Sequence, residues 1–104
     1  MERFGIQPGP DFVLPDESPT VVIECKVCED GGTVRDKAER LQALAGAAQS
    51  KGLIACAIVD GKGWRERANS LVDVIAAVHG RVYTLTTLPL ILEVPEIAAL
   101  RHKN

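Results

Sequence analysis

The chain has 104 residues, of which 46% are hydrophobic and 4% aromatic, enough for one domain around an aliphatic core. Its 12 Lys and Arg residues and 14 Asp and Glu residues give a formal net charge of −2, which excludes a strongly basic coat protein but allows a local cationic face. No apolar run approaches the roughly 20 residues that span a bilayer. Three cysteines without a leader favour reduced thiols. We therefore expect a single cytoplasmic domain over residues 1–104, with no membrane partner.

Turn formers and apolar periodicity predict alternating strands and helices. β-branched or unbroken apolar runs are typical of strands, and apolar residues at steps of three and four are typical of helices. In chain order, the patterns predict a loop (1–10), a strand (11–14), a turn (15–20), a strand (21–27), a helix (33–48), a buried strand (53–59), a helix (65–78), a strand (81–85), short helical or irregular pieces (88–100) and a polar tail (101–104). An N-terminal hairpin followed by strand–helix–strand crossovers predicts an α/β fold, a mixed β-sheet flanked by helices.

The predicted hairpin brings two carboxylates together. Its pairs are Leu14 with Val21, Val13 with Val22, Phe12 with Ile23 and Asp11 with Glu24. Directly opposed side chains have Cβ atoms about 5 Å apart, and two like charges repel there unless a cation or a proton separates them. Lys26 projects from the same face as Glu24 because strand side chains alternate, whereas the other face of this strand is apolar. We therefore expect Asp11, Glu24 and Lys26 to form a site on a solvent-open face.

These residues resemble a known motif. Pro10-Asp11, a turn, and Glu24-Cys25-Lys26 at the end of a β-branched run are similar to the motif of the PD-(D/E)xK nuclease superfamily, the fold of many restriction endonucleases and DNA-repair nucleases. The stretch 30–37 also looks like the start of the following helix in restriction-type members. The resemblance covers residues 10 to about 85 and implies a restriction endonuclease-like fold. Asp60-Gly61-Lys62 also satisfies the second half of the motif, but it lacks the hairpin.

The resemblance implies a role for each motif residue. Asp11 and Glu24, with the main-chain carbonyl of Cys25, would hold Mg²⁺, with Mn²⁺ as a substitute, because these hard cations prefer oxygen ligands. Lys26 would position or activate the attacking water in the hydrolysis of a DNA phosphodiester bond. Asp16 is an alternative to Asp11, since Pro15-Asp16 spells the same half of the motif. Asp11 is preferred because residue 16 falls in the turn, several strand residues from Glu24.

The predicted helix carries candidate contacts to double-stranded DNA. Arg35, Lys37 and Arg40 are placed to meet the phosphate backbone if the helix borders the cleft; the alternative is a solvated face balanced by Asp36 and Glu39. Duplex cleavage usually needs two active sites, so we expect a homodimer or a larger assembly.

The start of the chain departs from the superfamily. Many members carry a helix before the first motif strand, whereas residues 1–10 are rich in Gly and Pro and contain one acid, Glu2. We expect either a trimmed nuclease domain or a partner subunit that covers this side of the sheet. Three functions remain open: a restriction-type endodeoxyribonuclease, a structure-selective repair or recombination nuclease, and an inactive nuclease-fold binding module. The intact Asp11, Glu24 and Lys26 set argues against the last.

Overall fold

The structure, a computed structural model, describes residues 10–15 and 18–101. Its strands are β1 (Phe12–Leu14), β2 (Val21–Val27), β3 (Ile54–Asp60) and β4 (Val82–Tyr83). Its helices are α1 (Val34–Ser50), α2 (Lys62–Glu66), α3 (Ala68–Ala77), the 3₁₀ helix η2 (Leu88–Glu93) and α4 (Pro95–Arg101). The predicted α/β class is therefore confirmed.

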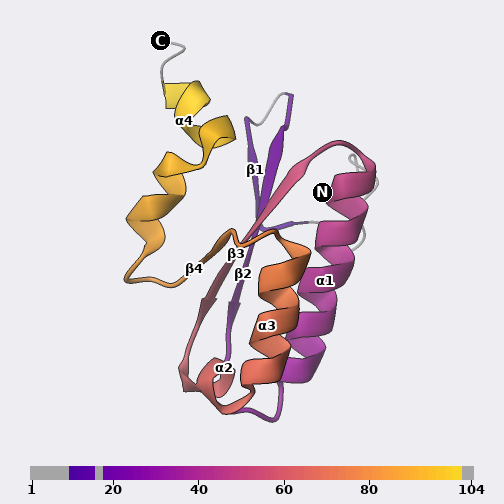
Figure 1. The fold of residues 1–104 in the computed structure, drawn as a ribbon, viewed down its shortest axis with the longest axis vertical. Coiled ribbons are helices and arrows are strands. Elements are labelled where there is room, and N and C mark those ends of the chain that lie inside the picture. The colour runs from indigo at the N-terminus through magenta and orange to yellow at the C-terminus, as the bar shows by residue number, and fades with distance from the viewer. Residues whose placement is uncertain (1–9, 16–17, 102–104) are drawn as a thin grey trace.

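The four strands form one mixed sheet in the order β1-β2-β3-β4 (Figure 1). β1 pairs with β2 antiparallel, and β2, β3 and β4 run parallel to one another. The hairpin register is Phe12 with Ile23, Val13 with Val22 and Leu14 with Val21, as predicted. The alternation of side chains and the turn length fix this register, because a slip of one residue would turn the apolar face of β2 outward.

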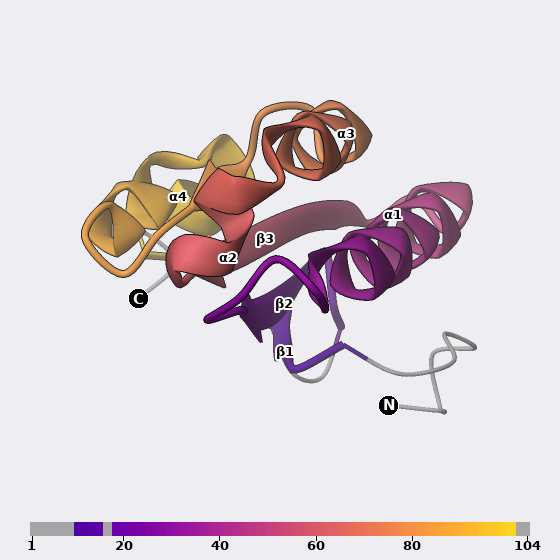
Figure 2. The same cartoon turned by 90° about the horizontal axis from the view of Figure 1, so that it is seen from below.

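Helices cover both faces of the sheet (Figures 1 and 2). On one face, α1 and α3 bury the strand residues Val13, Val22, Ala55, Ala57 and Val59. On the other face, η2 and α4 bury Val21, Ile23, Cys56 and Ile58. A strand covered on both sides needs apolar residues at successive positions, which explains the unbroken apolar run of β3.

Most elements differ by a residue or two from their predicted bounds, including β1, which begins at Phe12 and leaves Asp11 outside the strand; two elements differ more. The helix expected over 65–78 is split into α2 and α3 at Arg67, whose backbone leaves the helical region at φ −130° and ψ 60°. The side chain of Arg67 donates to the carbonyl of Gly31, so a tertiary contact holds the residue at this break. The strand expected over 81–85 ends at Tyr83, since the Leu85 N–H donates to the Asp60 carboxylate rather than to a neighbouring strand.

Some predictions fall on residues that the structure does not describe. Glu2, Asp16 and the loop over 1–10, except Pro10, lie outside the described residues, as does the polar tail after Arg101. Within the described ranges, none of the helices is both long enough and apolar enough to cross a membrane.

Candidate functional site

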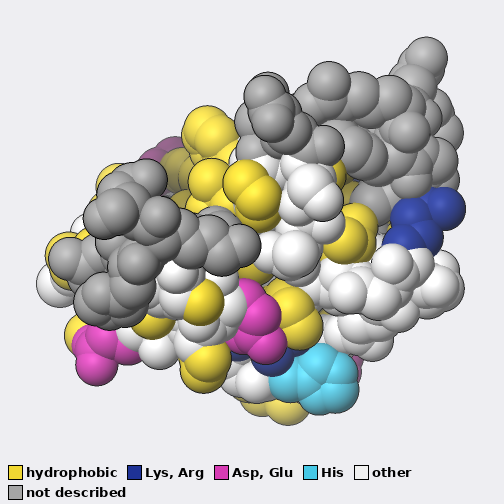
Figure 3. Space-filling view, turned by 90° about the horizontal axis from the view of Figure 1, so that it is seen from above, with side chains coloured by type: hydrophobic (Ala, Val, Ile, Leu, Met, Phe, Trp, Pro, Cys, Tyr) yellow, Lys and Arg dark blue, Asp and Glu magenta, His cyan; other side chains and the backbone are white. Residues whose placement is uncertain are grey.

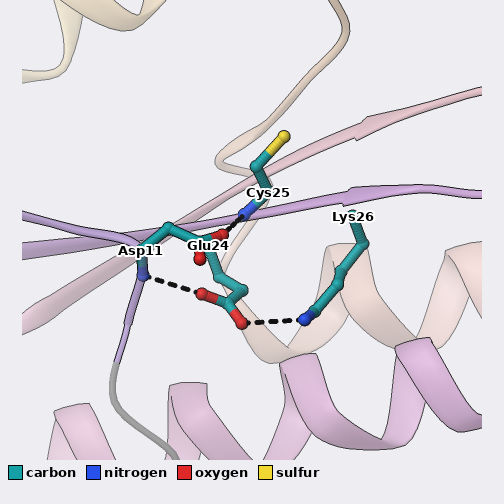
Figure 4. A network of polar contacts seen from close by, with 4 residues as sticks. All are labelled: Asp11, Glu24, Cys25 and Lys26. Carbon is teal, nitrogen blue, oxygen red and sulfur yellow. Dashed lines mark hydrogen bonds and ion pairs between the residues drawn. The ribbon is translucent and has the colours of Figure 1, made fainter. Parts of the chain in front are cut away.

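Asp11, Glu24 and Lys26 lie together beside the carboxyl-terminal half of β2 (Figure 4). The Asp11 N–H donates to Glu24 Oε1 at 2.9 Å, and Lys26 Nζ lies 3.1 Å from Glu24 Oε2. The Cys25 N–H donates to Asp11 Oδ2 at 2.8 Å. The hairpin thus brings the two acids and the amine into one connected network, although Asp11 precedes β1 and is not paired with Glu24 in the ladder as predicted.

The β1–β2 ladder ends where this network begins. The N–H of Cys25 is taken by the carboxylate of Asp11 instead of a main-chain carbonyl. Because the N–H and C=O of a strand residue point to the same side, the Cys25 carbonyl also faces the β1 edge. β1 begins only at Phe12, and the next ladder position opposite Cys25 is that of Pro10, which has no N–H to donate. The Cys25 carbonyl therefore lacks a ladder donor from this side.

The site is less open than the sequence predicts. Val22, Glu24 and Lys26 alternate on the face that α1 covers, and Figure 4 shows the two charged side chains extending toward the helical layer. Glu24 is 6% exposed, and the side chain of Lys26 is 17% exposed. Asp11 is exposed, so the network is reached from the β1 edge. The alternation in β2 predicts which residues share a face, but the cover comes from a helix that is distant in sequence.

Burial dominates the electrostatics of Glu24. Removal from water raises the pKa of the Glu24 carboxyl above its usual 4.5, although the hydrogen bonds from Lys26 and Asp11 act to lower it. Burial also raises the pKa of the Cys25 thiol, and the nearby charges of Asp11 and Glu24 raise it further. An additional positive charge beside Glu24 would favour its ionised form, so this network is suited to a cation.

The chemistry of the donors can be compared with that of a hard divalent ion. Among the described residues, no group of three or more His, Cys, Asp or Glu side chains is arranged to hold a metal. The carboxylates of Asp11 and Glu24 and the main-chain carbonyl of Cys25 would instead form an all-oxygen set. Mg²⁺ is commonly held by one or two carboxylates and keeps several of its waters, so such a sparse set suits it. The rival first ligand, Asp16, lies outside the described residues.

Two of the three candidate DNA contacts share a flank of α1. Lys37 and Arg40 line a groove of about 490 Å³ along this helix, and the acids Asp36 and Glu39 line it with them, as the alternative of a charge-balanced face predicts. Helical periodicity places Arg35 on the opposite flank, in line with Gln49, which donates to the Ala77 carbonyl of α3. Since α1 lies between α3 and β1 (Figure 2), Lys37 and Arg40 lie toward the β1 edge and Arg35 does not. Arg35 instead pairs with Glu39 at 3.4 Å.

The other end of the molecule has a different surface. The view from the end where β2 and β3 begin shows hydrophobic side chains gathered between the two grey regions (Figure 3). The Lys and Arg side chains visible among the described residues there are separated from one another. Neither this end nor the flank of α1, where Asp36 and Glu39 accompany Lys37 and Arg40, presents an unbroken cationic surface.

One contact to the site is missed by the sequence patterns. The indole N–H of Trp64, in α2, donates to the main-chain carbonyl of Lys26 at 3.2 Å. From sequence, Trp64 is expected only to anchor the helix that follows it. The available signal is its position between Gly63 and Arg65, close after Gly61, which does not specify a partner on β2.

Comparisons with known proteins add no relative. No family model, curated protein or solved structure matches the chain at a significant level. The likeness to the PD-(D/E)xK superfamily is thus carried by the motif residues alone.

Proposed function

We propose that the chain is a Mg²⁺-dependent endodeoxyribonuclease of restriction type that hydrolyses DNA phosphodiester bonds. One observation carries the proposal: Asp11, Glu24 and Lys26 form a connected polar network at the end of an otherwise apolar strand. Burial of a carboxylate that is linked to a second acid and an amine costs folding free energy, and such arrangements cluster at functional sites.

Each residue has a role that its position supports. The carboxylates of Asp11 and Glu24 and the carbonyl of Cys25 would hold Mg²⁺, which supplies Lewis-acid polarisation of the scissile phosphate. The Lys26 amine, 3.1 Å from Glu24, is placed to orient a water beside these oxygens and to offset charge that develops on the phosphate. The oxygen of the water would form a bond to phosphorus, the bond from phosphorus to the leaving oxygen would break, and the proton lost by the water would be balanced by the one that the leaving oxygen takes up.

The substrate would approach from the β1 edge. Asp11 is exposed there, and the flank of α1 with Lys37 and Arg40 lies toward the same edge. Contacts from these two cations to phosphates would position double-stranded DNA without reading its sequence. Cleavage of both antiparallel strands calls for a second copy of the chain or another domain, and a homodimer satisfies this need.

Plasmid cleavage tests the proposal. Supercoiled plasmid is incubated with the native chain in Mg²⁺, Mn²⁺, Ca²⁺ or EDTA, with branched duplexes as parallel substrates to detect structure-selective cleavage. We expect nicked or linear product with Mg²⁺ and Mn²⁺ and none with EDTA. Asp11→Asn abolishes cleavage and Asp16→Asn does not, if Asp11 is the first ligand. Metal-dependent nicking that survives both Glu24→Ala and Lys26→Ala would contradict the assigned site.

A nuclease-fold binding module without activity is the second candidate. The observation that favours it is the burial of Glu24, whose two oxygens are engaged by Asp11 and Lys26. A purely structural ion pair would have the same contacts. Calorimetric titration with Mg²⁺ and Mn²⁺ separates the candidates: a nuclease binds metal through Asp11 and Glu24, whereas the module binds DNA equally well with and without metal and cleaves none.

A further inference from the structure

The turn after β3 is hydrogen-bonded to the segment that follows β2. The Cys28 N–H donates to the Asp60 carbonyl at 2.9 Å, and the Gly63 N–H donates to the Cys28 carbonyl at 2.8 Å. Further along, the Glu66 carboxylate accepts the Gly31 N–H at 2.8 Å. Residues 61–67, here called the clasp, therefore contact the segment after β2 at several points.

Two glycines allow this close approach. Gly61 has a φ of +97°, and a Cβ there would lie 2.2 Å from the Cys28 carbonyl oxygen. A Cβ on Gly63 would lie 2.4 Å from the carbonyl oxygen of Asp30. Both distances are far shorter than any van der Waals contact, so a larger residue at either position would push the clasp away from β2.

Trp64 is the clasp residue that reaches the site. Its side chain is 2% exposed and packs in the core between the sheet and the helices α1 and α3. The indole has one donor, and it is directed at the carbonyl of Lys26. Trp64 thus touches the main chain of the residue whose amine pairs with Glu24, from a segment that is distant in the sequence.

We propose that Trp64 is a positioning residue for Lys26. Its hydrogen bond adds to the pairing of Lys26 with Val59 of β3, and the long Lys26 side chain turns a small backbone rotation into a larger displacement of the amine. Without this bond, Lys26 Nζ would no longer be held at 3.1 Å from Glu24 Oε2. The effect on catalysis rests on the proposed nuclease function, whereas the effect on the Lys26 amine does not.

The chain contains one tryptophan, so position 64 can be changed without touching another indole. Trp64→Phe removes the N–H but leaves an aromatic ring. Biosynthetic replacement of tryptophan by benzothienylalanine keeps the bicyclic shape and exchanges only the N–H for sulfur. Tyr83→Phe is the matched control, because it removes a polar group from a half-buried aromatic ring on β4. Circular dichroism and thermal unfolding check that each variant is folded.

The first measurement is the NMR signal of the Lys26 side chain in lysine-labelled protein, assigned by its loss in Lys26→Ala. We expect it to move in both Trp64 variants and to stay in place in Tyr83→Phe. The second is steady-state DNA cleavage: kcat falls by about 10- to 100-fold while KM stays within about twofold, as for a misplaced catalytic group. In the Lys26→Ala background, replacing Trp64 produces no further fall.

Three results would overturn the proposal: an unmoved Lys26 signal in the benzothienylalanine protein, a native kcat in both Trp64 variants, or an equal loss of kcat with and without Lys26. An equal loss of kcat with and without Lys26 would show that replacing Trp64 perturbs the structure generally and not through Lys26. If the native chain cleaves no DNA, the proposed function fails, and the Lys26 signal by itself still decides the role of Trp64.

Discussion

Two acid-x-Lys sequences lie at the ends of neighbouring parallel strands, Glu24-Cys25-Lys26 in β2 and Asp60-Gly61-Lys62 after β3. In the first, the acid is buried on the α1 face and pairs with its lysine. In the second, the acid is partly exposed and the lysine is exposed. The same short motif therefore produces two different local structures.

The difference lies in what the carboxylate oxygens contact. Asp60 accepts the N–H of Gly61 at 2.7 Å with one oxygen and the N–H of Leu85 at 2.9 Å with the other. These backbone hydrogen bonds lower the pKa of the Asp60 carboxyl, whereas burial raises the pKa of Glu24. Asp60 acts as a structural cap for a turn, while Glu24 remains a candidate ligand because it has a second acid beside it.

The largest expected effect is the difference in cleavage between variants of Glu24 and of Asp60. Glu24→Gln keeps the shape of the side chain and removes its charge, and we expect metal-dependent cleavage to fall at least about 10³-fold because a metal ligand is lost. Asp60→Asn leaves cleavage within about fivefold, since its oxygens serve the turn. Plasmid nicking rates and Mn²⁺ binding by calorimetry measure both. Equal losses in the two variants would contradict the distinction.

The lysines provide the next comparison. Lys26→Met should reduce kcat by about 10²-fold, because the amine that orients the water is gone. Metal binding should persist in this variant, since no oxygen ligand is removed. Lys62→Met serves as the matched control and should cleave at the native rate. A Lys26→Met variant with native kcat would show that the amine serves only as the partner of Glu24.

The helix that follows the first motif allows a test of DNA contact. Replacing Lys37 and Arg40 together with Ala should weaken DNA binding by about 10-fold at low salt and by less at high salt, because phosphate contacts release counterions. Arg35→Ala, on the opposite flank, should have a smaller effect. Fluorescence anisotropy with a labelled duplex at several salt concentrations measures this difference. A larger loss for Arg35 would reverse the proposed orientation of α1.

The smallest effects concern pH and stability. Because the pKa of Glu24 is raised, the folded chain binds this proton more tightly than the unfolded chain, so the free energy of unfolding falls as pH rises from 4.5 through the raised value. For Asp60 the sign is opposite: its contribution is present above pH 3.8 and is lost as pH falls through the lowered value.

Urea unfolding across this pH range measures both dependences. Glu24→Gln should remove the pH dependence assigned to Glu24, and Asp60→Asn should remove the one assigned to Asp60. Saturating Mg²⁺ should abolish the loss of stability that accompanies ionisation of Glu24, because the bound ion favours its charged form. A Glu24→Gln chain with the native pH dependence would contradict the sign assigned to Glu24.

Much of the site follows from local rules. Strand alternation places Glu24 and Lys26 on one face, as the structure has them, whereas Asp11 lies outside β1 and reaches Glu24 through its backbone N–H rather than as a ladder partner. The same patterns leave Glu24-Cys25-Lys26 and Asp60-Gly61-Lys62 distinguishable only by the hairpin. These short patterns cannot predict that the backbone N–H of Leu85 donates to Asp60, because that contact joins residues 25 positions apart.

The sequence by itself determined the order of strands and helices, the hairpin register and the set of polar residues on β2, since periodicity and turn chemistry act between near neighbours. Only the tertiary structure decided that α1 covers Glu24, that Trp64 holds the carbonyl of Lys26, and that Lys37 and Arg40 share a flank without Arg35. These features depend on how elements pack across long stretches of chain, and packing geometry is not encoded in any short pattern.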